Sequence, residues 1–244
     1  MVKSKKGGKI SIGNLKNILN DSYSKTGNNI GDYKIDKELT DDVIKVYKND
    51  KTNEVVMAPK GTSSLNDVAT DISMFFGYKD KRFKSAKDKL DKVKAKYPDS
   101  KLDLAGHSLS GKIVEEIGAN DDRVNNIYTL NKPTTAFDIV TNRKGINKQI
   151  DIRTKNDLIS VLKPFGTKNP NDRVIDSNTS NPLTEHKIEK LNDLNQDEII
   201  GTGLSKLSIK ELKVILKQIK EKNKHIKISN LKKIDIIKLI SEHQ

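Results

Sequence analysis

The sequence contains no cysteine and no tryptophan, and only 5% of its 244 residues are aromatic. The absence of cysteine excludes a disulfide framework and cysteine-based zinc sites. Because aromatic side chains are few, a hydrophobic core has to be built mainly from Ile, Leu and Val. The length allows one medium-sized domain with such a core and one small additional unit.

Long apolar runs are also absent. No stretch of about 18 apolar residues occurs, so we expect no transmembrane segment. The first 14 residues are basic but lack the apolar stretch of a signal peptide, and we therefore expect an intracellular protein.

Positive charge is abundant, since 46 Lys and Arg residues outnumber 33 Asp and Glu residues and give a formal net charge of +13. Such a charge attracts nucleic acid, anionic lipid headgroups or acidic proteins. Lys, Asn, Ile and Asp are all frequent, as an AT-rich genome would produce, so the charge alone identifies no partner.

Composition divides the chain into four regions. Residues 1–39 begin with an arm rich in Lys and Gly and continue into an extension with a short expected helix at residues 12–19. Residues 40–192 carry alternating strand and helix signals and form the main domain. Residues 193–203 are a linker. Residues 204–244 hold 11 Lys against four Asp and Glu, and predict a small basic helix–loop–helix.

The main domain is expected to be of the α/β class. Short segments rich in β-branched and apolar residues predict strands at residues 43–47, 54–58, 101–105, 126–130 and 149–153. Apolar residues at spacings of three and four between Phe83 and Tyr97 predict a helix that ends before Pro98. A second helix is expected from Ser108 to residue 117, with Gly118 as its C-cap. This alternation predicts a mainly parallel sheet flanked by helices.

The segment from Leu102 to Gly111 carries the strongest functional signal. It predicts a strand, a tight turn and a helix, with Gly106 and Ser110 placed two residues before and after Ser108. A nucleophile elbow needs this arrangement, because larger side chains at those two places would clash in the strained turn. The turn also points the free N–H groups of the helix N-terminus at a developing anion. Ser108 is therefore the candidate nucleophile.

A serine nucleophile needs a base, and the sequence contains four histidines. His107 adjoins Ser108, so its side chain points away from that of the serine. His225 and His243 lie in the basic tail. His186 is the remaining candidate, in a polar loop whose position suits a base that has to reach a site.

The acid that orients the base is expected between the serine and the histidine, which is the chain order of α/β-hydrolases. Asp157 follows the strand expected at residues 149–153, at the edge of a parallel sheet where Ser108 also lies. Alternatives are one aspartate inside that strand and three elsewhere: Asp151, Asp138, Asp172 and Asp176.

An oxyanion hole needs two N–H donors. One is expected from Leu109, directly after the nucleophile. The other is expected from Thr62, because it follows Gly61 in the loop after the strand at residues 54–58, and a glycine there allows close approach of the backbone.

These pieces, in this order, make residues 40–192 resemble the class 3 (fungal-type) lipase family of the α/β-hydrolase superfamily. The segment Lys60-Gly-Thr-Ser-Ser-Leu-Asn-Asp67 resembles the family's oxyanion loop, and Tyr128-Thr-Leu-Asn-Lys-Pro133 resembles its strand that ends in a small residue and Pro. The resemblance implies a catalytic triad and an oxyanion hole formed by Ser108, Asp157, His186, Thr62 and Leu109.

The sequence departs from the family pattern in three places. Ser110 stands where the family usually has Gly, and Lys60 stands where it usually has Arg. The domain also leaves little room for a large lid. The apolar patch of residues 74–78 is either a minimal lid at a lipid-contact edge or buried core.

The C-terminal region resembles a SAP-type helix–extended-loop–helix module, which implies DNA binding through residues 204–244. Lysine-rich, cysteine-free hydrolases of this build resemble those of large DNA viruses or their satellites, which implies an intracellular or virion-associated protein.

The family resemblance implies a serine esterase or lipase that hydrolyses carboxylic esters of lipids or phospholipids through an acyl-enzyme, with no cofactor and no metal. The positive charge favours an anionic membrane surface. The alternative is a non-catalytic nucleic-acid-binding or virion structural protein on a lipase-like fold, since a fold does not dictate an activity. A virion-packaged lipase tethered by its basic tail would combine the two.

Overall fold

A computed structural model describes residues 10–62, 81–133, 148–155, 157, 173–176 and 185–193. The chain divides into two units, residues 1–194 and 195–244, and every described residue belongs to the first. The apolar patch at residues 74–78 and the basic module at residues 204–244 lie outside the described residues, so the expectations for both stay predictions.

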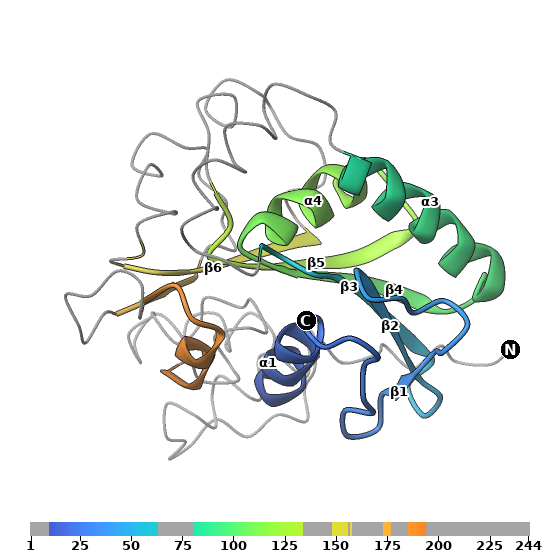
Figure 1. Cartoon of the computed structure of the whole chain (residues 1–244), viewed down its shortest axis with the longest axis horizontal. Helices are drawn as coiled ribbons and strands as arrows, with labels where there is room; N and C mark the ends of the chain where they lie inside the picture. Colours follow the sequence, from blue (N-terminus) through green and yellow to red (C-terminus); the bar gives the residue numbers. More distant parts are fainter. Residues whose placement is uncertain are drawn as a thin grey trace, which may run out of the picture. The chain divides into compact units, whose positions relative to one another are not determined.

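The described part of the chain is built on a seven-stranded sheet whose strands follow one another in chain order from β1 to β7 (Figure 1). The strands are β1 (Lys34–Ile35), β2 (Ile44–Asn49), β3 (Glu54–Pro59), β4 (Lys101–His107), β5 (Val124–Leu130), β6 (Gln149–Thr154) and β7 (Arg173–Ile175). The first three strands pair antiparallel, and β3 to β7 pair parallel. The predicted α/β fold with a mainly parallel sheet is confirmed.

The five strands expected from the sequence are all present, with ends displaced by at most two residues. The strands β1 and β7 were not expected. They have two and three residues, which is too short to show an alternating pattern, and their pairing with β2 and β6 defines them.

Helices cover both faces of the sheet. The helices α3 (Lys81–Lys96) and α4 (Leu109–Gly118) lie on one face, and α1 (Ile12–Asp21) lies on the other with the 3-10 helix η3 (Ile188–Asp193), as Figure 1 shows. Between α3, α4 and the sheet lies a cluster of aliphatic side chains that includes Leu90, Leu104 and Ile127. The predicted apolar stripe of α3 therefore faces the core.

Gly118 does not cap α4 as expected. It is the last helical residue, and Ala119 follows with right-handed backbone angles. A Cβ at Gly118 would lie 2.7 Å from Leu104 Cδ1 and 2.9 Å from Ile127 Cδ1, in the sheet below. The glycine is there because helix and sheet approach closely, a reason that the chain sequence does not reveal.

Residues 10–39, for which the sequence indicated no role, are joined to this sheet. β1 pairs with β2, and α1 packs against β4 and η3. Ser11 caps α1 by accepting a hydrogen bond from Asn14 N (3.2 Å). At the other end of the helix, the buried Asp21 accepts a hydrogen bond from Tyr47 Oη (2.7 Å) in β2. The C-terminal end of α1 is thereby fixed to the sheet.

A buried network of charged groups connects α4 to β5 and β6. Lys132 Nζ lies 2.6 Å from Glu115 Oε1 and 2.8 Å from Asp151 Oδ1. Lys112 also pairs with Glu115 (2.9 Å), and the Gln149 amide donates to both carboxylates. Although burial alone lowers it, the two carboxylates raise the pKa of Lys132 above its usual value. Each buried charge here has an opposite charge beside it.

Within the described ranges, no helix combines the length and the apolar character needed to cross a bilayer.

Candidate active site

Ser108 occupies a strained turn between β4 and α4. Its φ of 58° and ψ of −132° lie outside the regions that non-glycine residues normally adopt. The turn is held from the neighbouring strand, because Ser108 N donates to Leu130 O at the end of β5 (2.9 Å). The strand–turn–helix expected around this serine is present.

Gly106 and Ser110, on either side of the turn, differ in how much space they have. A Cβ at Gly106 would lie 2.6 Å from the backbone nitrogen of Gly111, so this position has room only for glycine. Ser110 is compatible with the turn because its hydroxyl accepts from His107 N (3.0 Å) and donates to His107 O (2.9 Å). The hydroxyl that distinguishes this chain from the usual family pattern thus closes the turn.

Asp157 and His186 lie together, although 29 residues separate them in the chain. Asp157 Oδ1 is 2.7 Å from His186 Nδ1, and both side chains are buried. Asp157 N donates to Thr154 O (3.2 Å) at the end of β6, which places the carboxylate at the C-terminal edge of the parallel sheet. Since a carboxylate oxygen only accepts, His186 carries a proton on Nδ1, and its Nε2 is the nitrogen that remains to act as a base.

Ser108 Oγ and His186 Nε2 share an unusual property. Both atoms are buried, with Ser108 exposing 1% and His186 exposing 3% of their surfaces. Neither has a hydrogen-bond partner in the described structure. Buried polar atoms without partners are costly, and in native proteins they concentrate where a ligand or a reacting group supplies the missing bond.

A hydrogen bond to His107 holds the main chain of His186 beside the turn. The carbonyl oxygen of His186 lies 2.7 Å from His107 Nε2, and the two imidazole rings are 4.8 Å apart. Both ring nitrogens of His107 bond elsewhere, Nε2 to His186 O and Nδ1 to Tyr23 Oη, so the ring is not a partner of Ser108 Oγ. Burial, followed by the nearby His186, lowers the pKa of His107 to about 3, so the ring is neutral at physiological pH.

Two positions that contribute to the site were missed in the sequence. Asn131 has a φ of 48° at the end of β5, accepts from Thr154 N (2.8 Å) and donates to Glu185 O (3.0 Å). It thereby links β6 to the residue before His186. The second is Tyr23, whose hydroxyl lies 2.8 Å from His107 Nδ1. An Asn that follows a strand hints at a left-handed backbone position, but Tyr23 carries no such signal.

The loop after β3 approaches the turn closely at Gly61. A Cβ at this position would lie 2.6 Å from His107 O and would also collide with the Tyr23 hydroxyl. Thr62 follows directly and is half-buried. Leu109 is the first residue of α4, so its N–H has no acceptor within the helix. The two expected oxyanion donors, Thr62 and Leu109, therefore come from two segments that approach each other at Gly61 and His107, next to Ser108.

The alternative acids that the structure describes lie elsewhere. Asp151 takes part in the buried network with Lys132, and Asp176 is exposed, with Lys155 Nζ 3.8 Å away. Asp138 and Asp172, like His225 and His243, lie outside the described residues.

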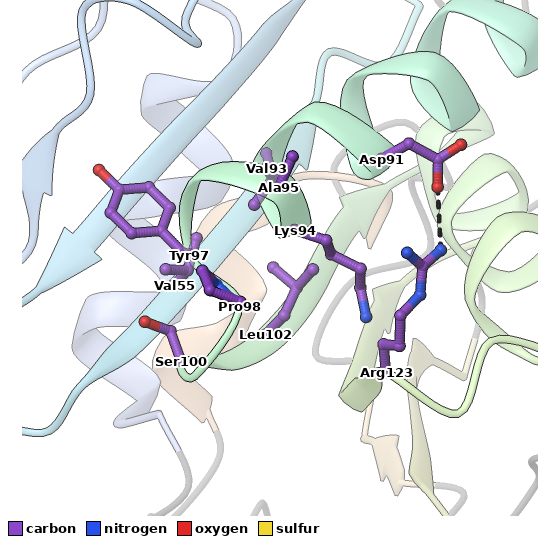
Figure 2. A pocket seen from close by; sticks show the side chains of 10 residues that line it. All are labelled: Val55, Asp91, Val93, Lys94, Ala95, Tyr97, Pro98, Ser100, Leu102 and Arg123. Carbon is purple, nitrogen blue, oxygen red and sulfur yellow. Dashed lines mark hydrogen bonds and ion pairs between the residues drawn. The ribbon is translucent and has the colours of Figure 1, made fainter.

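A second feature of the described structure is a cavity of about 420 Å³ (Figure 2). It is lined by residues at the N-terminal ends of β3 and β4 and at the end of α3: Val55, Asp91, Val93, Lys94, Ala95, Tyr97, Pro98, Ser100, Leu102 and Arg123. Arg123 pairs with Asp91 (2.9 Å) across its mouth, and Lys94 pairs with Asp121 (3.5 Å). The cavity lies at the edge of the sheet opposite to Ser108, and its charges are paired.

Among the described residues, no group of three or more His, Cys, Asp or Glu side chains is arranged to hold a metal ion. The chemistry that the site offers is that of a serine, an imidazole and a carboxylate.

Comparison with known proteins bears on the fold. No family model and no curated protein matches the sequence. Among solved structures, the Lip2 lipase of Yarrowia lipolytica matches with a TM-score of 0.51 and 16% identity, over 68% of this chain and 78% of its own. This chain has the fold of a lipase.

A Rhizomucor miehei lipase, solved in complex with its propeptide, also matches, with a TM-score of 0.46 and 16% identity. The match spans 64% of this chain and 64% of that lipase, which is less than two thirds of its length. The lipase fold therefore rests on the Yarrowia match and on the seven-stranded sheet, and at this identity it shows the fold alone.

Proposed function

We propose that this protein is a serine hydrolase that cleaves carboxylic esters of lipids or phospholipids. The observation that carries the proposal is a pair of buried atoms, Ser108 Oγ and His186 Nε2, that have no partner among the described residues and lie next to a strained turn. The hydrogen bond of 2.7 Å between His186 and Asp157 supports it, because it leaves the imidazole in the tautomer that a base requires.

In the proposed mechanism, His186 Nε2 takes the hydroxyl proton as Ser108 Oγ attacks the ester carbonyl carbon. The carbonyl oxygen becomes an oxyanion, which the amides of Leu109 and Thr62 stabilise. The oxyanion collapses, His186 gives its proton to the leaving alcohol, and an acyl-serine remains. Water, deprotonated by His186, then attacks the acyl carbon, and His186 returns the proton to Ser108 Oγ as the carboxylic acid leaves. Asp157 stabilises the imidazolium during both steps.

The lipid part of the proposal draws on the fold and the charge. The solved structure with the same fold is described as a lipase. The net charge of +13 attracts anionic headgroups, so phospholipid surfaces are the favoured site of action. If this is correct, activity on anionic vesicles falls as added salt screens the attraction, while activity on a soluble short-chain ester changes little. Activity on anionic vesicles that is independent of salt would remove the anionic surface from the proposal.

The experiment that tests the ester-hydrolase proposal is labelling of the purified protein with a fluorophosphonate, in the presence of detergent or vesicles. The serine oxygen bonds to phosphorus, fluoride leaves, and His186 takes the proton. We expect labelling of the wild type and its loss in Ser108→Ala and His186→Ala. A wild type that is folded, as circular dichroism checks, and yet does not react would show the proposal to be wrong.

The basic tail remains a separate proposal. No observation on the described residues favours a non-catalytic protein, and DNA binding through residues 204–244 rests on their charge alone. Removal of these residues tests it. Loss of DNA binding with unchanged fluorophosphonate labelling would favour a tethered hydrolase.

A further inference from the structure

A line of hydrogen bonds runs behind the turn at Ser108 and crosses three parts of the chain. Tyr23 Oη lies 2.8 Å from His107 Nδ1, and His107 Nε2 lies 2.7 Å from His186 O. The Tyr23 hydroxyl also lies against Gly61 in the loop after β3, where a Cβ would collide with it. The line thus begins beside this loop and ends at the residue whose side chain faces Asp157.

The direction of each bond follows from the atoms involved. A carbonyl oxygen only accepts, so His107 carries its proton on Nε2 and donates to His186. The other ring nitrogen, Nδ1, then has a lone pair and accepts from Tyr23. Burial raises the pKa of Tyr23 and lowers that of His107, so the protons stay where these bonds need them.

The contact between the two loops is too close for an extra atom. At Gly61, a Cβ would lie 2.6 Å from the carbonyl oxygen of His107 and would overlap the Tyr23 hydroxyl. The phenol ring of Tyr23 stands edge-on to the His107 imidazole, at 5.9 Å and 62°. Since the main chain of His107 is also bonded to the Ser110 hydroxyl, a shift of either loop would break hydrogen bonds in the turn itself.

Tyr23 is well placed to act as a support because its own main chain is fixed. Tyr23 N donates to Asn20 O (3.1 Å) in the turn after α1. Asp21 is held by Tyr47 in β2 and by both the N–H and the amide of Asn28. The tyrosine therefore extends from a rigid helix end into the space between the two loops.

We propose that Tyr23 is a positioning residue of the site. Its hydroxyl joins His107 in a bridge that holds the loop at Gly61 and the main chain of His186 at fixed places beside the nucleophile. The bridge touches no substrate, and it acts by setting the position of an oxyanion donor and of the base. The inference rests on the proposed function, because such positioning affects a rate only if Ser108 reacts.

The test is Tyr23→Phe, which removes one oxygen and keeps the ring. We measure fluorophosphonate labelling at several reagent concentrations and separate the maximal rate constant kinact from the half-saturating concentration KI. Loss of the hydrogen bond to His107 is expected to lower kinact about tenfold, since about 1.4 kcal/mol corresponds to tenfold. We expect KI to stay unchanged, because the bridge does not contact the reagent.

Tyr33→Phe is the matched control. Tyr33 is buried where Tyr23 is half-buried, and its hydroxyl donates to Glu54 Oε2 (2.8 Å), away from the turn. Both variants lose a phenol hydrogen bond, so both lose stability. A general loss of folded protein lowers the final labelled fraction, whereas a loss of positioning lowers kinact with the final fraction unchanged. We expect the control to leave kinact unchanged.

The outcomes separate the two proposals. If wild type does not react, the ester-hydrolase proposal is wrong and the bridge has no rate to set. If wild type reacts and Tyr23→Phe reacts with the same kinact, the hydrolase proposal stands and the positioning role of Tyr23 is wrong. An equal drop in kinact for Tyr23→Phe and Tyr33→Phe would also overturn it, because the effect would then be a general one.

Discussion

Two groups of buried polar residues differ in whether their hydrogen-bonding groups have partners. In the network of Glu115, Lys132 and Asp151, opposite charges lie within 2.9 Å of one another. At the turn, Ser108 Oγ and His186 Nε2 are equally buried and have no partner in the described structure. Burial of a polar group costs free energy unless it is bonded, so the first group contributes to a defined fold. The second group carries an unmet cost, which is typical of a site that binds or reacts.

The largest expected difference between the two groups is in the rate of reaction. Asp157→Asn keeps the shape of the side chain but places an amide beside His186 Nδ1, which favours the wrong tautomer. We expect kcat on a soluble ester to fall by roughly 10⁴-fold, with little change in stability. Steady-state kinetics and urea unfolding of the same samples check it. A variant that keeps a tenth or more of the wild-type kcat would show that Asp157 does not orient the base.

Asp151→Asn makes the same chemical change in the other group and should have the reverse effect. It leaves Lys132 with one carboxylate in a buried place, and breaking such a pair costs roughly 3 kcal/mol. We expect the free energy of unfolding in urea to fall by about this amount, while kcat of the folded protein stays within a factor of about three. A fall in kcat as large as that of Asp157→Asn would remove the distinction between the two groups.

The sequence predicted the features that depend on neighbouring residues, and it predicted less well those that depend on residues far apart in the chain. The helix from Phe83 to Tyr97 and the turn at Ser108 were predicted, because spacing and small residues are local signals. Asp157 and His186 were proposed from chain order and family resemblance, and no local pattern indicates that their side chains meet. Order along the chain limits the choice of acid to a few residues, and only the fold selects among them.

The contacts that no pattern predicted join different elements of the fold. Tyr23 meets His107 across 84 residues, from a helix whose role the sequence did not indicate. Gly118 was expected to end a helix, but its position is set by side chains of two strands. A tyrosine or a glycine has the same local signal in many settings, and its partner is decided by tertiary structure.

Asp103 is an intermediate case that sharpens the comparison. This carboxylate, on the strand that precedes the candidate nucleophile, is buried and accepts hydrogen bonds from Asn125 and Asn126, which are neutral. Burial raises the pKa of Asp103 from 3.8 to about 6. The folded state therefore binds this proton more tightly than the unfolded state does. Its contribution to stability is fully present below pH 4 and is lost as the pH rises through 6.

Asp103→Asn removes this dependence. A pKa difference of about two units corresponds to on the order of 3 kcal/mol, an upper limit because unfolded chains are not fully solvated. We expect the unfolding free energy of Asp103→Asn, relative to wild type, to increase between pH 4 and pH 7 by up to this amount. Urea unfolding at four pH values checks it. A difference that does not vary with pH would mean that Asp103 titrates normally in the folded protein.

The smallest expected effect concerns Ser110, where the chain departs from the usual family pattern. Its hydroxyl bonds to both main-chain groups of His107, and Ser110→Ala loses these bonds while keeping a good helix former. We expect a loss of about 1 kcal/mol for Ser110→Ala, and a larger loss for Ser110→Gly, because glycine adds the entropy cost of a flexible helix residue. The fluorophosphonate reaction should keep its kinact in both variants, since neither bond reaches Ser108 Oγ or His186.

Ser110→Gly introduces the residue that the resembled family usually has at this position. Its effects on stability and on kinact can therefore be compared. If the hydroxyl only replaces a glycine that the turn tolerates, the variant loses stability and keeps its rate. If kinact falls together with stability, the turn of Ser108 depends on Ser110 for its strained backbone angles. The line of hydrogen bonds through Tyr23 and His107 would then extend to the helix that follows the nucleophile.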